Sequence, residues 1–62
     1  MAWVAVDKDY TEWIYDDKPW RENEDHWIDN SPWSTYIQLP QGTIKKLIGR
    51  ELTWEDEPVE LK

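Results

Sequence analysis

The stretch AWVAVDKDYTEWIY, residues 2–15, decides the fold of this 62-residue chain. It holds two short runs rich in β-forming residues, 2–6 and 11–15, separated by four residues that include two aspartates. This pattern predicts a β-hairpin. The hairpin turn is expected to need a left-handed residue near position 10, where glycine is the easy choice and the chain has Tyr10. Either Asp9 takes that conformation instead, or the turn is strained.

The expected register of the hairpin pairs Val6 with Thr11 and Val4 with Trp13. One face of the ribbon then carries Val4, Val6 and Trp13, and the other carries Trp3, Ala5 and Ile14. Both faces are partly apolar, so we expect both to be covered.

Three further elements are predicted after the hairpin. STYIQL, residues 34–39, is strand-like and ends at Pro40, and VEL, residues 59–61, suits a last short strand. QGTIKKLIG, residues 41–49, predicts a helix of about two turns. Such a short helix must pack on the sheet to be stable.

The predicted helix has an expected beginning and end. Thr43 is the expected N-cap, and Gly49 suits the left-handed position after the last turn. Ile44, Leu47 and Ile48 form one apolar stripe, which should face the sheet.

Together these elements predict an α+β fold in a single domain over residues 1–62. We expect a three- to four-stranded antiparallel sheet with one short helix on one face, in the chain order β-β-β-α-β. The predicted core is Val4, Val6, Ile14, Ile37, Leu39, Ile44, Leu47, Ile48 and Trp54.

Residues 16–33 form a predicted loop rich in tryptophan and acid, with no clear period. The spacing of Trp13, Trp20 and Trp27 by seven does not indicate a coiled coil, because the intervening positions are not apolar. One helical turn over 21–27 stays open. We expect at least one of the loop's indoles to be buried and the tip, 21–25, to be exposed. The predicted contact residues are Trp20, Glu22, Glu24, Asp25, Trp27, Asp29 and Trp33.

The composition narrows the function. A net charge of −7 opposes direct binding to nucleic acids and to anionic membranes. The start has no basic region before its short apolar run, so we expect no secretory signal. We therefore expect the protein to be cytoplasmic. The chain has no cysteine, so stability must come from a core dense in its six tryptophans and three tyrosines, or from a partner.

Charge is distributed in blocks along the chain. Residues 1–30 hold nine acids and three bases, residues 31–50 hold three bases and no acid, and residues 51–62 hold five acids and one base. The acidic blocks can pack near the basic helix, or they can face a basic partner.

No catalytic or metal-binding motif stands out. His26 is the only histidine, and its acidic neighbours are more typical of a solvated loop than of a general base or a zinc site. The segment from Asp7 starts like a calcium loop but has Glu12 where glycine belongs. We therefore expect no cofactor, no metal and no enzymatic activity.

The segments 39–61 and WVAVDKDYTEWIY, residues 3–15, with the tryptophan-rich loop between them, resemble small uncharacterised proteins of bacteriophages and prophages. In those proteins glycine usually stands near position 10, where this chain has Tyr10. The resemblance implies an accessory protein inside an infected or lysogenic cell, and it transfers no functional residue.

Three functions fit the sequence. The first is an accessory protein that binds a host defence or regulatory protein through acids and exposed tryptophans, in its stronger form by mimicking nucleic acid. The second is a homodimeric module that associates through a strand edge or exposed indoles. The third is a carbohydrate or ligand surface built on Trp20, Trp27 and Trp33.

Overall fold

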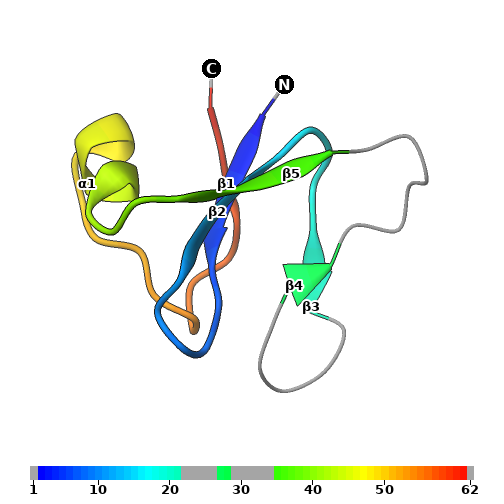
Figure 1. Ribbon diagram of the computed structural model, residues 1–62, viewed down its shortest axis with the longest axis horizontal. Helices are drawn as coiled ribbons and strands as arrows, with labels where there is room; N and C mark the ends of the chain where they lie inside the picture. The colour runs from blue at the N-terminus through cyan, green and yellow to red at the C-terminus, as the bar shows by residue number, and fades with distance from the viewer. Residues whose placement is uncertain (1, 22–26, 29–34, 62) are drawn as a thin grey trace.

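The structure is a computed structural model that describes residues 2–21, 27–28 and 35–61. The elements along the chain are β1 (Trp3–Val6), β2 (Glu12–Tyr15), β3 (Trp20–Arg21), β4 (Trp27–Ile28), β5 (Tyr36–Leu39), α1 (Thr43–Ile48) and β6 (Val59–Glu60). Four strands form an antiparallel sheet in the order β5-β2-β1-β6, with α1 beside it (Figure 1). The predicted α+β fold is confirmed.

The predicted loop contains two additional short strands. Strands β3 and β4 pair antiparallel as a separate two-stranded sheet, with Trp20 opposite Ile28. In Figure 1 this small sheet and α1 lie on opposite sides of β1 and β2. The two ends of the described chain lie side by side, because the Leu61 backbone N–H donates to the Ala2 carbonyl at 2.8 Å.

The predicted hairpin register is wrong by one residue. Val6 pairs with Glu12 and Val4 pairs with Ile14. The physical reason is the turn: Tyr10 itself has a φ of 71°, and its N–H donates to the Asp7 carbonyl at 2.9 Å. A turn followed by one left-handed residue is typical of three-residue hairpin loops, whereas the predicted register assumed four.

The one-residue shift exchanges side chains between the two faces, since successive strand residues point to opposite sides. Ile14 therefore joins Val4 and Val6 beneath the helix, and Trp13 joins Ala5 on the other face. The expectation that both faces are covered is confirmed, because each face carries its own buried cluster.

The first cluster lies between the sheet and α1. Its buried members are Val4, Val6, Ile44 and Leu52, and half-buried Ile14, Leu39, Ile48, Val59 and Leu61 pack against them. The second cluster, on the opposite face, consists of Ala5, Tyr15 and Trp27, with Trp3, Trp13 and Trp54 around them.

Two residues of the predicted core lie on the surface. Ile37 is 64% exposed and Leu47 is 51% exposed. Ile37 belongs to β5 at the edge of the sheet, and Ile44 is the only residue of α1 that is buried. Ile48, at the end of the helix, is half-buried against the first cluster, so Leu47 is the residue of the apolar stripe that lies outside the core.

The helix ends as predicted and begins differently. Gly49 has a φ of 80° and its N–H donates to the Lys45 carbonyl at 2.9 Å. The N-cap is Gly42, with a φ of 92°, whereas the Thr43 hydroxyl donates to the Pro40 carbonyl at 2.6 Å. The prediction of Thr43 as the N-cap is therefore wrong, and the helix start is capped from elsewhere.

Candidate functional site

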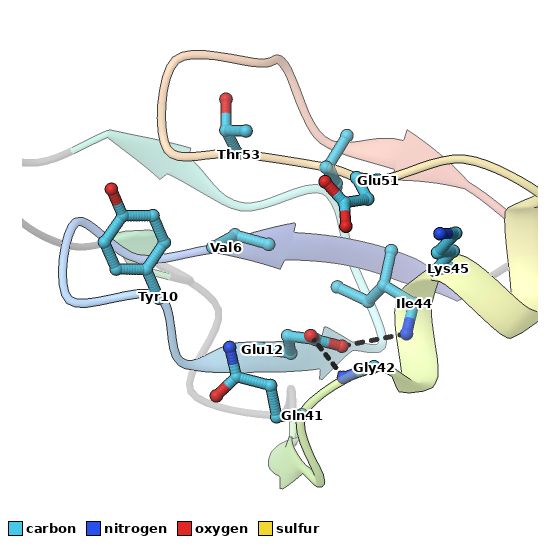
Figure 2. Close-up of a pocket in the computed structure, with 10 residues that line it drawn as sticks. Val6, Tyr10, Glu12, Gln41, Gly42, Ile44, Lys45, Glu51 and Thr53 are labelled. Carbon is cyan, nitrogen blue, oxygen red and sulfur yellow. Dashed lines mark hydrogen bonds between the residues drawn. The ribbon is translucent and has the colours of Figure 1, made fainter.

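The cap of the helix comes from the hairpin. One Glu12 carboxylate oxygen accepts the Gly42 N–H at 2.7 Å and the other accepts the Ile44 N–H at 2.8 Å (Figure 2). The first N–H groups of a helix have no partner within the helix, so a carboxylate there supplies both hydrogen bonds and favourable charge. Glu12 thus ties β2 to the start of α1.

A hollow opens beside this contact. It has a volume of about 250 Å³ and lies between the tip of the hairpin, the start of α1 and the segment after the helix. Figure 2 shows Tyr10 and Val6 from the hairpin, Lys45 from the helix, and Glu51 and Thr53 from the later segment around it.

Tyr10 borders a second hollow as well. This one, of about 340 Å³, is lined by Lys8, Tyr10, Thr53, Trp54 and Glu55. The Tyr10 side chain is 67% exposed. An exposed tyrosine that holds a left-handed backbone is uncommon and costs on the order of 1 kcal/mol or more, and such conformations cluster at functional sites.

The two hollows gather acids from distant parts of the chain. Glu12 comes from the first acidic block, whereas Glu51 and Glu55 come from the last one. Asp9 lies at the hairpin tip, where the Thr11 hydroxyl donates to its carboxylate at 2.6 Å and the Thr11 N–H at 3.1 Å. These hydrogen bonds, led by that from the hydroxyl, hold the pKa of Asp9 below its usual value of 3.8.

We call Tyr10, the two hollows and the carboxylates of Asp9, Glu12, Glu51 and Glu55 the Tyr10 site. Lys8 and Lys45 are its two cations. The site offers an exposed aromatic ring that borders two hollows and an excess of negative charge. Among residues 2–21, 27–28 and 35–61, no three potential ligands gather to hold a metal ion.

The contact surface predicted over residues 16–33 is only partly described. Trp20 is 52% exposed. Trp27 is 6% exposed, so its ring is buried. It is therefore not accessible as part of the predicted contact surface or of a sugar-binding platform made of three indole rings. The remaining predicted contact residues, Glu22, Glu24, Asp25, Asp29 and Trp33, lie outside the described residues, as does His26.

Trp27 is anchored to the hairpin by two hydrogen bonds and to Trp54 by a ring contact. Its ring N–H donates to the Val6 carbonyl at 2.9 Å, and its backbone N–H donates to the Asp7 carboxylate at 3.0 Å. Its ring meets that of Trp54 edge-on, with centroids 5.6 Å apart. The expectation that at least one loop indole is buried is confirmed.

Sequence reasoning missed the Tyr10 site, although one of its signals was visible. Tyr10 stands where glycine would relieve strain, and that departure marked the position. The proximity of 8–12 to 51–55 has no local signal, since it results from packing of the segment after the helix.

Searches of protein-family models, curated proteins and solved structures find no match to this chain. Within the part of the chain that the structure describes, no helix has the length and apolar character needed to cross a bilayer.

Proposed function

We propose that this chain is a small non-enzymatic accessory protein of the cytoplasm that binds another protein through the Tyr10 site. The observation that carries the proposal is the two-thirds exposed ring of Tyr10, held at a φ of 71° between two hollows. Tyrosine is enriched among the residues that dominate binding energy at interfaces, and flanking hollows can accept side chains of a partner.

The charge of the site indicates a basic partner. The carboxylates of Glu12, Glu51 and Glu55 line the two hollows and Asp9 precedes Tyr10 in the chain, against two lysines, in a chain of net charge −7. Complementary charge raises the association rate and disfavours acidic partners. In the stronger form of the proposal, the carboxylates stand in for phosphates against a nucleic-acid-binding protein. The resemblance to phage and prophage proteins favours a bacterial host factor.

The test compares wild-type protein with Tyr10→Gly as baits for a bacterial lysate, with captured proteins identified by mass spectrometry. Glycine adopts positive φ freely, so the variant should be as stable as wild type or up to about 1 kcal/mol more stable. Loss of the captured protein therefore reports the ring and not the fold. Trp20→Ala is the matched control, because Trp20 is a comparably exposed ring outside the site.

Charge is tested separately with Glu51→Lys and Glu57→Lys. Both residues are exposed and both changes shift the net charge equally, but only Glu51 lines a hollow. We expect the Glu51 variant to bind the captured protein more weakly and with a smaller salt dependence. No specific capture at low or physiological salt, or capture that survives Tyr10→Gly and fails in Trp20→Ala, would refute the proposal.

A further inference from the structure

Strand β5 forms one edge of the four-stranded sheet, and no other strand of the described residues pairs with its outer side. The sheet order places it beside β2 alone. Tyr36 is 59% exposed, Ile37 is 64% exposed, and Gln38 is also exposed. Natural edge strands are usually protected by charged side chains, proline or a covering segment. Between Tyr36 and Leu39 the strand has neither charge nor proline.

The hydrogen-bond pattern shows which backbone groups of β5 face outward. The Asp16 N–H donates to the Thr35 carbonyl at 3.1 Å, so Thr35 faces β2. In an antiparallel ladder successive residues alternate sides, so Ile37 and Leu39 also face β2. The N–H and carbonyl groups of Tyr36 and Gln38 therefore point away from the sheet, and neither pairs with any backbone group of the described residues.

The charge near this edge differs from that of the rest of the molecule. The chain has a net charge of −7, yet residues 31–50, which include β5 and α1, contain three bases and no acid. A second copy would be repelled by most of this protein's surface, but along β5 it would meet uncharged side chains.

We infer that the occupant of this edge is a second copy of the chain, paired β5 to β5 in antiparallel orientation with the two-fold axis through Ile37. Tyr36 then lies opposite Gln38 of the partner subunit, and the outward groups of the two residues form four hydrogen bonds across the dimer. The two Ile37 residues face each other in a non-hydrogen-bonded pair, where Cα atoms are about 4.5 Å apart and side chains touch.

The two neighbouring registers that are shifted toward Pro40 fail. An axis through Gln38 would place Tyr36 opposite Pro40 of the partner subunit, and proline has no N–H to donate. The Pro40 carbonyl already accepts the Thr43 N–H at 3.1 Å. An axis between Ile37 and Gln38 would set outward-facing groups against inward-facing ones. The register through Ile37 satisfies both chains, covers the exposed isoleucine and joins two sheets into one of eight strands.

The test uses the absence of cysteine from the chain. Ile37→Cys should form a disulfide-linked dimer under mild oxidation, because the two thiols face each other. Tyr36→Cys and Gln38→Cys are matched controls: in this register each thiol is offset by two residues from its copy, about 8 Å between Cα atoms, beyond disulfide reach. Equal cross-linking of all three variants, or none in Ile37→Cys, would overturn the inference.

A second measurement does not depend on cysteine. Sedimentation equilibrium of the wild type should show a dimer that strengthens as salt rises, because salt screens the repulsion between two acidic chains. Gln38→Pro removes one outward N–H from each chain and leaves the β2–β5 ladder intact. It should weaken the dimer about thirtyfold, the factor for two lost backbone hydrogen bonds. A wild type that stays monomeric to about 1 mM at all salt concentrations refutes self-pairing.

Discussion

Among the acidic residues, we expect replacement of Glu12 to lower the free energy of unfolding most. Its carboxylate accepts the Gly42 and Ile44 N–H groups, one on each oxygen, and so joins β2 to α1. Hydrogen bonds to charged groups contribute about 1.5–3 kcal/mol each, and loss of a helix cap costs about 0.5–2 kcal/mol. Because Glu12 is half-buried, we expect Glu12→Ala to cost about 2–3 kcal/mol.

That loss is large for a chain of this length. At about 0.05–0.15 kcal/mol per residue, the whole domain is stable by roughly 3–9 kcal/mol. The midpoint of thermal unfolding should therefore fall by about 8–24 °C. Urea unfolding followed by tryptophan fluorescence and far-ultraviolet circular dichroism measures the free-energy change, with an unchanged m-value as the check on two-state behaviour.

Two further variants isolate the cause. Glu12→Gln keeps one acceptor oxygen of two, so its cost should lie between wild type and Glu12→Ala. Thr43→Ala removes a hydroxyl whose hydrogen bond goes to Pro40 and leaves the helix N–H groups capped, so it should cost less than about 1 kcal/mol. A loss below about 0.5 kcal/mol in Glu12→Ala, or an equal loss in Thr43→Ala, would refute the reasoning.

Three other outcomes are expected. The pKa of the Asp9 carboxyl should lie below 3.8 in an NMR pH series and rise toward that value in Thr11→Val, and an unshifted titration would contradict the hydrogen bonds. Because the folded pKa is lowered, the stability that this carboxylate contributes to the hairpin is present above pH 3.8 and is lost as the pH falls through the folded pKa. Trp27→Phe leaves a buried carbonyl without its donor and should cost about 1–3 kcal/mol in urea unfolding; a neutral effect would show that water replaces the indole. Leu52→Ala should cost about 2–5 kcal/mol and Leu47→Ala below about 0.5, and comparable losses would contradict their assigned burial.

The helix and strands were predicted correctly because their patterns lie within a few neighbouring residues. The errors concern how these elements pair and pack. The hairpin, the third strand, the helix and the last strand each have a pattern of their own within a few residues, and all four form. The register slipped by one residue because it depends on how many residues the turn takes up, which the backbone of Tyr10 decides.

Burial was predictable for residues of the inner strand β1 and of the helix turn that faces the sheet, and not for residues of the edge strand β5. Val4, Val6 and Ile44 are buried as expected. Ile37 has the same apolar character, but its exposure follows from the place of β5 in the sheet order. Trp27 is buried because a loop distant in sequence brings it to the Val6 carbonyl.

The sequence by itself determined the α+β class, the antiparallel hairpin, the short helix with its Gly49 end, and the excess of negative charge. These depend on residue periodicity and composition, which act over a few positions. Only the tertiary structure decided that Glu12 caps the helix, that residues 8–12 meet residues 51–55 around Tyr10, and that β5 is left at an open edge. Each of those results depends on contacts between segments far apart in the chain, and no short stretch of sequence encodes such contacts.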